Sequence, residues 1–359
     1  ASFASAIGVP EALGARVYER VLEKLRREPV EDFRIDFEDG YGNRSDEEED
    51  SHAAAAAREV ATARDAGTLP PFIGIRIKPL TSELATRSLR TLDVFLTTLC
   101  ASGPVPQGFV VTLPKITDRM HVKALVSVLE LLEQQLTLAP GTLKLELMIE
   151  TTQSILDPRG RVILPRLRDA AGARLVGAHF GTYDYTAGCD ITAAHQRMRH
   201  PACDFAKQMM KVSFAGTGVA LSDGATNIMP VPLHRGGNLT DAQQRENRAA
   251  VHAAWRLHAD DVRHSLRNGF YQGWDLHPAQ LPTRYGAVYG FFLDGLAPAS
   301  ERLKNFMDKA AQATLVGDVF DDAATGQGLL NYFLRGIACG AVREDEALAT
   351  GLSLEEIRG

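Results

Sequence analysis

Two acidic residues, Glu150 and Asp184, each end an apolar run, and their type and spacing suggest chemistry. The first run is KLELMIET, residues 144–151, and the second is RLVGAHFGTYD, residues 174–184. Short aliphatic runs followed by polar loops predict buried strands of a parallel sheet. Barrel active sites form at the carboxyl ends of such strands, so the two carboxylates are predicted to bind one hard divalent cation together. The alternative is a buried ion pair with Arg76 or Lys115.

Ionisable residues recur at the end of every predicted strand. A buried charge needs a partner or a metal ion, and purely structural strands would not be expected to end so consistently in charged groups. The predicted strands are 33–39, 72–79, 108–115, 144–151, 174–184, 219–223 and 271–278. Their ends carry Asp36, Glu38 and Asp39; Arg76; Lys115; Glu150; Asp184; Asp223; and His277.

Helices alternate with these strands, which predicts an α/β fold with a parallel sheet. We expect a TIM (β/α)8 barrel whose first strand precedes residue 1, because seven strands are found and a barrel needs eight. An open doubly wound sheet is the alternative, although its Gly-x-Gly-x-x-Gly signature is absent. The barrel is predicted to be the catalytic domain, residues 1–295, followed by a helical C-terminal extension, residues 296–359. The predicted helices are 11–28, 46–65, 89–99, 122–136, 160–171, 195–210 and 243–268.

Composition excludes some classes of function. The 359 residues carry a formal net charge of −6, which argues against a general nucleic-acid binder. The 4 cysteines have no ligand-type spacing, which favours a reduced, cytoplasmic protein. No segment is typical of a membrane span or a secretory signal. The acidic run 46–50 is interpreted as complementing the positive end of a helix dipole.

Six short motifs in order resemble a known family. The match runs from about residue 11 to 295, and the chain resembles citrate lyase β-subunit-like proteins and malyl-CoA lyases, which belong to the metal-dependent 2-oxo acid aldolases. The motifs are Ile35-Asp36-Phe37-Glu38-Asp39, Ile75-Arg76-Ile77-Lys78-Pro79, Leu113-Pro114-Lys115, Ile149-Glu150-Thr151, Phe180-Gly181-Thr182-Tyr183-Asp184 and Leu276-His277-Pro278.

The resemblance implies a pyruvate-kinase-like TIM barrel with lyase activity. The expected function is a Mg²⁺-dependent carbon–carbon lyase or aldolase that acts on a small 2-oxo or 3-hydroxy acid, free or as its CoA thioester, through an enolate. Mn²⁺ is an alternative metal. Two alternatives stay open: a malate-synthase-like Claisen condensation of an acyl-CoA with glyoxylate, and a non-catalytic metabolite-binding homologue.

The resemblance also implies roles for individual residues. Glu150 and Asp184 would be the metal ligands. Arg76 would hold a carbonyl or enolate oxygen. Glu38 and Asp39 would orient a metal-bound water or Arg76. The general base is not assigned; a water held by Asp39 and a residue from a partner subunit's tail are both candidates.

Substrate binding is expected to involve Gly181, Thr182 and Lys115 together with Arg76. Lys115 has the alternative role of a salt bridge, and His277 is interpreted as a positioned structural histidine. Lys78 stands where the family commonly has Asn. The family's first strand, which binds coenzyme A, is not in this sequence, so a free 2-oxo or hydroxy acid is favoured. The resemblance implies a homo-oligomer whose helical tail covers its own barrel or a neighbour's active site.

Overall fold

The computed structural model describes residues 2–308, 314–316, 319–321 and 323–348. Two compact units are found. The first, called the sheet unit, consists of residues 30–225 and 272–274. The second, called the helical unit, contains the remaining described residues. The predicted division into residues 1–295 and 296–359 stays a prediction.

The sheet unit contains seven parallel strands in chain order, β1 to β7. All seven predicted strands are confirmed, most with shorter bounds than predicted. The sequential order has no reversal point, which excludes the doubly wound alternative. No described strand joins β7 to β1, so the eighth strand stays a prediction. The strands are β1 (Asp32–Asp36), β2 (Phe72–Arg76), β3 (Phe109–Leu113), β4 (Lys144–Ile149), β5 (Leu175–Phe180), β6 (Ala220–Ala225) and β7 (Gln272–Trp274).

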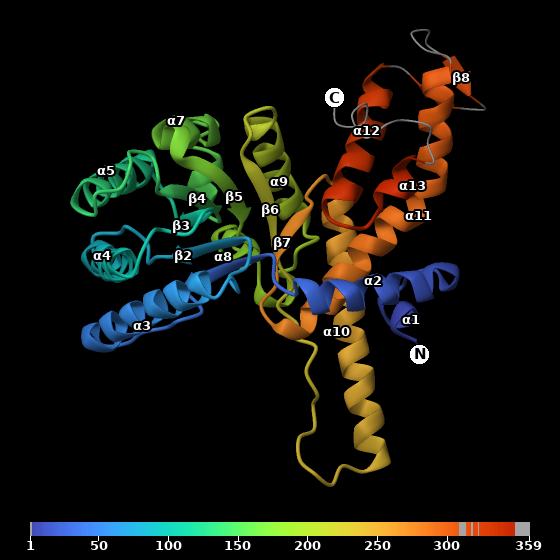
Figure 1. Cartoon of the computed structure of the whole chain (residues 1–359), viewed down its shortest axis with the longest axis horizontal. Helices are drawn as coiled ribbons and strands as arrows, with labels where there is room; N and C mark the ends of the chain where they lie inside the picture. The colour runs from blue at the N-terminus through green and yellow to red at the C-terminus, as the bar shows by residue number, and fades with distance from the viewer. Residues whose placement is uncertain (1, 309–313, 317–318, 322, 349–359) are drawn as a thin grey trace. The chain divides into compact units, whose positions relative to one another are not determined.

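Helices connect the strands and pack beside the sheet (Figure 1). Ser45 caps the first, α3, by accepting a hydrogen bond from the Glu48 backbone N–H, and four acidic residues occupy its first turn. Apolar residues recur along α4, and Phe95 of that helix stacks on Phe109 with ring centroids 5.8 Å apart. The helices are α3 (Asp46–Asp65), α4 (Ala85–Ala101), α5 (Arg119–Gln135), α6 (Thr152–Ile155), α7 (Leu164–Ala171), α8 (Thr182–Gly188) and α9 (Pro201–Phe214).

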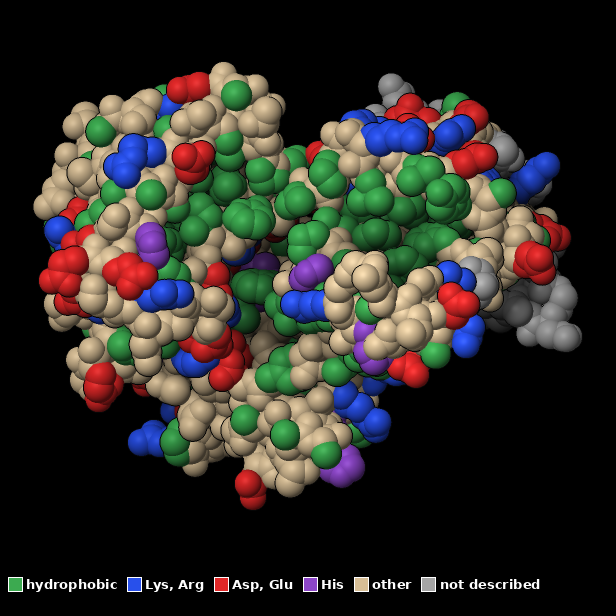
Figure 2. Space-filling view, turned by 90° about the horizontal axis from the view of Figure 1, so that it is seen from below, with side chains coloured by type: hydrophobic (Ala, Val, Ile, Leu, Met, Phe, Trp, Pro, Cys, Tyr) green, Lys and Arg blue, Asp and Glu red, His purple; other side chains and the backbone are tan. Residues whose placement is uncertain are grey.

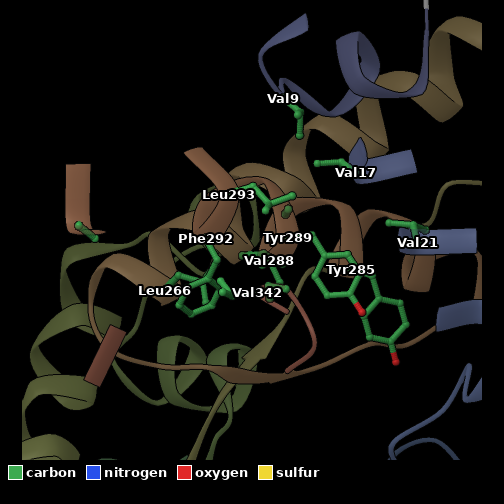
Figure 3. Packing of buried hydrophobic residues seen from close by; sticks show 14 of the residues in the cluster. Val9, Val17, Val21, Leu266, Tyr285, Val288, Tyr289, Phe292, Leu293 and Val342 are labelled. Carbon is green, nitrogen blue, oxygen red and sulfur yellow. The ribbon is translucent and has the colours of Figure 1, made fainter. Parts of the chain in front are cut away.

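The helical unit has its own apolar core (Figure 3). Val17 and Val21 from α2 pack with Tyr285, Tyr289 and Phe292 from α11, and all five are buried. Its elements are α1 (Phe3–Ile7), α2 (Gly14–Arg27), α10 (Asp241–Arg267), α11 (Leu281–Asp308), α12 (Ala323–Ala338) and α13 (Glu344–Leu348), with the antiparallel pair β8 (Thr314–Val316) and β9 (Val319–Asp321).

Two details differ from the expectations. The strand predicted over residues 174–184 ends at Phe180, and Asp184 lies in the first turn of α8. Gly181 follows the strand and precedes that helix, so the backbone changes direction before it reaches Asp184. In its described residues the extension from residue 296 is mostly helical, as expected, but residues 314–316 and 319–321 pair as antiparallel strands. Residues 349–359 of that extension lie outside the described residues.

The surface carries both signs of charge. Figure 2 shows Lys and Arg side chains intermixed with Asp and Glu over the face in view. In the described part of the chain, no helix combines the length and the apolar character needed to cross a bilayer.

Candidate functional site

The expected site residues Glu38, Asp39, Arg76, Lys115, Glu150 and Asp184 come together in the sheet unit. They follow or end β1, β2, β3 and β4, or lie in the first turn of α8 after β5. Parallel strands bring their carboxyl ends to one edge, which explains how residues up to 146 positions apart in sequence meet. Hydrogen bonds and ion pairs connect these residues.

Arg76 is held by Asp36 in a two-point contact. Its Nε donates to Asp36 Oδ1 at 2.7 Å and its Nη2 to Oδ2 at 2.6 Å. Asp36 also accepts the backbone N–H groups of Glu38 and Gly40, as expected for a structural hydrogen-bonding residue. Burial alone would raise the pKa of Asp36, but the bonds and charge of Arg76 and these two N–H groups hold it below its usual value.

Lys115 stands between three carboxylates. Its ammonium lies 2.9 Å from Glu38 Oε1, 2.9 Å from Asp39 Oδ2 and 3.0 Å from Asp184 Oδ2. Burial opposes the charged form, yet the charge of Glu150 and the bonds to Glu38 and Asp39 raise the pKa of Lys115. Its backbone has φ +48°, in the left-handed region that few non-glycine residues adopt. Both alternatives predicted for Lys115 are therefore compatible with its place: it forms salt bridges within the expected site.

The strained backbone of Lys115 has a clear consequence for Glu150. The Lys115 backbone N–H donates to Glu150 Oε1 at 2.7 Å. Residues in rare backbone conformations cost about 1–3 kcal/mol and persist where the surrounding structure holds them. Here the turn after β3 aims a backbone donor at a buried carboxylate.

Glu150 is the most perturbed acid of the site. Its side chain is 1% exposed. Burial raises the pKa of Glu150 to about 7, Lys115 opposes the shift, and the nearby charges of Asp184 and Glu38 add to it. Gly181 makes room for the carboxylate, because a Cβ at that position would lie 2.5 Å from Glu150 Oε2. A larger residue at 181 would displace Glu150.

Glu38 and Asp39 connect the two cations. Glu38 Oε2 lies 3.2 Å from Arg76 Nη1 and accepts the Asp39 backbone N–H at 2.9 Å, while its Oε1 faces Lys115. Burial raises the pKa of Glu38 despite these cations. Burial also acts on Asp39, but hydrogen bonds from Lys115 and with Glu38 lower its pKa. Glu38 thus bridges Arg76 and Lys115, whereas Asp39 is 55% exposed at the opening.

The charges in this cluster do not balance. Five carboxylates, Asp36, Glu38, Asp39, Glu150 and Asp184, share two cationic side chains. Buried charges of one sign without partners are costly, so a carboxylate must keep its proton or the cluster must take up an outside cation. The raised pKa of Glu150 corresponds to the first response, in which a carboxylate keeps its proton.

The donor set fits a hard divalent cation with few protein ligands. Within the described residues, no group of three or more His, Cys, Asp or Glu side chains has an arrangement that would hold a metal. Mg²⁺ commonly binds one or two carboxylates and fills its octahedron with water and substrate oxygens. Glu150, whose Oε1 accepts a backbone N–H, and Asp184, whose side chain is 40% exposed, are two carboxylates of this type. The ligand roles of the two residues stay a prediction.

Thr182 carries an unsatisfied group beside these acids. Its hydroxyl Oγ1 is buried, and no hydrogen-bond partner for it is found in the described structure. The backbone of Gly224 approaches it closely, because a Cβ there would lie 2.3 Å from Oγ1. A buried donor without a partner usually marks strain or a missing ligand. This suits the substrate-binding role expected of Thr182, which stays a prediction.

Two residues at predicted strand ends have other partners. Asp223 on β6 pairs with Lys207 of α9 at 3.0 Å, and both side chains are 1% exposed. His277 belongs to the helical unit, where its Nδ1 accepts the Ala279 backbone N–H. This contact holds the His277 ring in place, as expected of a positioned structural histidine, and Asp223 forms a buried ion pair.

Sequence reasoning missed a buried pair beside the site. Glu49, within the acidic run 46–50, is 1% exposed and lies 2.6 Å from Lys78 Nζ. Lys78 also donates to the Phe37 carbonyl at 2.8 Å. The helix-dipole interpretation holds for the first turn of α3, but it is wrong as the whole explanation of Glu49. The signal was available: Lys78 replaces a family Asn, and a buried lysine requires an acid.

A buried polar layer below the site was also missed. It consists of Arg34, Thr112, Glu146, His179 and Trp274, which extend from β1, β3, β4, β5 and β7. Glu146 lies on β4 and Glu150 directly follows that strand, four residues later, so the alternation of side chains along a strand places both on the same side of the sheet. That spacing was the available signal.

Comparison with known proteins shows what this chain is similar to. A search of curated protein sequences finds no match. A citrate lyase from Burkholderia xenovorans LB400 is structurally similar, with a TM-score of 0.65 and 20% identity over 94% of this chain and 93% of that one. A Haloferax volcanii malate synthase, crystallised at 3 mM glyoxylate, has a TM-score of 0.52 and 17% identity over 84% and 81%. Its magnesium/glyoxylate complex has a TM-score of 0.50 and 16% identity over 96% and 92%.

These similarities concern the fold, since the identities are low. They agree with the parallel α/β sheet, whose strands follow one another in chain order. A family model described as "Domain of unknown function (DUF6986)" matches residues 1–359. The chain therefore belongs to the DUF6986 family.

Proposed function

We propose that this protein is a Mg²⁺-dependent carbon–carbon lyase that cleaves a small 3-hydroxy acid, or the corresponding 2-oxo acid aldol, through an enolate. The observation that carries the proposal is the unbalanced cluster at the strand ends, where, among the residues that the structure describes, five carboxylates meet two cationic side chains, Arg76 and Lys115. An excess of oxygen ligands beside a fixed guanidinium suits a cation together with an anionic, carbonyl-bearing substrate.

In this proposal Glu150 and Asp184 hold Mg²⁺, with Mn²⁺ as an alternative. When bound, such a cation supplies Lewis-acid polarisation of a carbonyl oxygen. Asp36 fixes Arg76, whose outward N–H groups bind the carbonyl or enolate oxygen. Glu38 holds Arg76 and Lys115 at a set separation, and Asp39 orients water at the opening.

The bond changes follow from this arrangement. The hydroxyl of the substrate loses its proton to a base, the adjacent carbon–carbon bond breaks, and its electron pair moves onto the neighbouring carbonyl as an enolate. Protonation of the enolate carbon completes the reaction. Arg76 stabilises the developing oxyanion, a contribution of roughly 3–4 kcal/mol for a well-placed donor in known oxyanion sites.

The small-molecule side of the proposal rests on Gly181 and Thr182, which follow β5. The unpaired Thr182 hydroxyl is available to a substrate carboxylate, and Lys115 contributes positive charge. Similarity to a malate synthase that was crystallised with magnesium and glyoxylate supports a 2-oxo acid as the ligand class.

The test is ligand-dependent thermal stabilisation followed by turnover. Pyruvate, glyoxylate and oxaloacetate are added with and without Mg²⁺ to the wild-type chain, to Glu150→Gln and to the control Glu130→Gln, an exposed glutamate of α5. We expect Mg²⁺-dependent stabilisation in the wild type and control, and a loss of about 10²–10³-fold in turnover for Glu150→Gln. Equal Mg²⁺-dependent turnover in Glu150→Gln would contradict the proposal.

A second candidate is the reverse type of reaction, a Claisen condensation of an acyl-CoA with glyoxylate. The similarity to malate synthase favours it. Formation of a new acid from acetyl-CoA and glyoxylate, dependent on Mg²⁺, distinguishes it from cleavage. Stabilisation by a 2-oxo acid without any turnover in either direction would instead favour a metabolite-binding homologue.

A further inference from the structure

Trp274 is the last residue of β7 and lies against the arginine of the site. Its ring faces the guanidinium of Arg76, with Cζ 5.2 Å from the ring centroid. The pairing of β6 with β7 shifts register between Asp223 and Ala225, so that Ala225 stands opposite Trp274. Both residues belong to the sheet unit. A cation over an indole face is attracted by the negative face of the ring.

The indole is itself tethered by a hydrogen bond. Its Nε1–H donates to His179 Nδ1 at 2.8 Å, and the two rings meet edge to face at 80°. Because Nδ1 accepts, the proton of a neutral His179 is on Nε2. That nitrogen lies 2.9 Å from Glu146 Oε2 without forming a hydrogen bond, so the contact is electrostatic.

Glu146 is a fixed anchor for this tether. Arg34 binds both of its oxygens, with Nε 2.9 Å from Oε2 and Nη2 2.7 Å from Oε1, and the Thr112 hydroxyl adds a bond at 3.2 Å. A glycine gives it room, because a Cβ at Gly177 would lie 3.0 Å from Glu146 Oε1. The connection therefore runs from a buried ion pair through an imidazole and an indole to Arg76.

We propose that Trp274 is a positioning residue that fixes the plane of the Arg76 guanidinium. The carboxylate of Asp36 grips one edge of the guanidinium and so sets its direction within the plane. A contact at the edge still allows the guanidinium to rotate out of that plane. The indole face, packed against the guanidinium, prevents this rotation. His179 keeps the indole from turning away. The inference rests on the proposed function, in which Arg76 binds the substrate oxygen.

The physical reason for such a device is the precision that catalysis requires. A displacement of about 1 Å can reduce a rate by roughly 10²-fold. Arg76 is long and flexible, so contacts with Asp36 and Glu38 at its edges alone would leave its N–H groups free to tilt out of the guanidinium plane. A flat ring against the guanidinium limits that spread.

The first arm of the test uses the arginine side-chain NMR spectrum of the full chain without any ligand. Arg76→Lys identifies the Arg76 Nε–H signal. We expect Trp274→Leu to remove the ring-current shift of this signal, and Trp274→Phe, which keeps a ring but loses the tether to His179, to change it partly. The control is Trp255→Phe in α10, which also loses an indole hydrogen bond, to the Ala279 carbonyl at 3.0 Å. An Arg76 signal unchanged in both Trp274 variants would overturn the inference.

The second arm measures pyruvate binding at saturating Mg²⁺ by calorimetry, and turnover where the wild type shows it. We expect the kcat/KM of Trp274→Leu to fall by roughly 10²-fold, with Mg²⁺ affinity unchanged. Trp255→Phe should match the wild type. If Trp274→Leu alters melting temperature alone and binds pyruvate as the wild type does, the inference is overturned. A wild type that binds no 2-oxo acid defeats the proposed function, whereas the NMR arm still decides the position of Arg76.

Discussion

Glu146 lies on β4 and Glu150 directly follows that strand, four residues later. Both are buried, but their surroundings shift their pKa values in opposite directions. Glu146 meets Arg34, Thr112 and His179, and although burial alone would raise its pKa, the nearby imidazole of His179 and the charge and hydrogen bonds of Arg34 lower it. Glu150 meets a backbone N–H and the shared charge of Lys115, and its pKa rises to about 7. Burial is similar at the two positions, with exposed fractions of 6% and 1%.

This difference separates two kinds of buried charge. In the polar layer around Glu146, each charged group has a dedicated partner inside the protein. At the strand-end site around Glu150, the acids outnumber their partners, and the missing compensation must come from a proton or a bound cation. A functional site and a structural ion pair can therefore be distinguished by the excess of charge, and burial alone does not distinguish them.

The largest expected effect comes from removing the charge of Glu146 in the polar layer, where each charged group has a partner. Glu146→Gln leaves the buried Arg34 without its main carboxylate, so the free energy of unfolding should fall by about 3–5 kcal/mol. Urea unfolding measures this. The control Glu130→Gln, at an exposed position, should stay within about 0.5 kcal/mol of the wild type. A small loss in Glu146→Gln would mean that Asp32 or water compensates Arg34, and the contrast would fail.

At the strand-end site around Glu150, removing the carboxylate should change the stability in the opposite direction. A folded-state pKa above the unfolded value means that the folded protein retains a proton, so stability declines as pH rises from about 4.5 to about 7. Without divalent cations, Glu150→Gln removes this decline and should be more stable than the wild type at pH 8 by roughly 2–3 kcal/mol. Urea unfolding at pH 5 and pH 8 tests it. Lower stability of Glu150→Gln at both pH values would contradict the comparison.

A third cluster tests the same criterion in the helical unit. Asp275 lies 2.9 Å from Arg284 Nη2 and 2.9 Å from His258 Nε2. Burial acts to raise its pKa, but the charge and hydrogen bonds of Arg284, together with the nearby His258, lower it to about 2. This lowered pKa contributes stability above the unfolded value near 3.8, and the contribution is lost as pH falls toward 2.

Asp275→Asn should therefore lower the free energy of unfolding at pH 7 by roughly 2–3 kcal/mol. The difference from the wild type should shrink between pH 4 and pH 2, as measured by thermal unfolding across that range. Asp294→Asn, at an exposed position of the same unit, serves as the control. A difference that is constant with pH would show that the loss arises from packing and not from charge.

The smallest expected effect concerns the shared cation. Lys115→Met removes an ammonium that lies 3.0 Å from Asp184 Oδ2, so a divalent cation no longer meets that repulsion. Mg²⁺ affinity should rise about tenfold, equivalent to about 1.4 kcal/mol. Calorimetry measures it, with Lys123→Met, at an exposed position of α5, as the control. Weaker Mg²⁺ binding in Lys115→Met would show that Lys115 supports the metal site.

Much of the sheet unit could be predicted from sequence because its signals are local. Apolar runs with strand spacing, separated by amphipathic helices, correctly placed all seven strands. The expected gathering of Glu38, Arg76, Lys115 and Glu150 also followed, since parallel strands align their carboxyl ends. Element ends were less predictable: Asp184 lies on a helix, because Gly181 turns the chain before the residue is reached.

The partners of buried charges were not predictable, because they come from distant positions. Nothing local connects Glu49 with Lys78, or His179 with Trp274 across 95 residues. The sequence by itself determined which residues are acidic, basic or aromatic and the order in which strands present them. Only the tertiary structure decided which acids are compensated and which are not, because a charge in a low-dielectric interior is governed by neighbours a few ångströms away, whatever their distance along the chain.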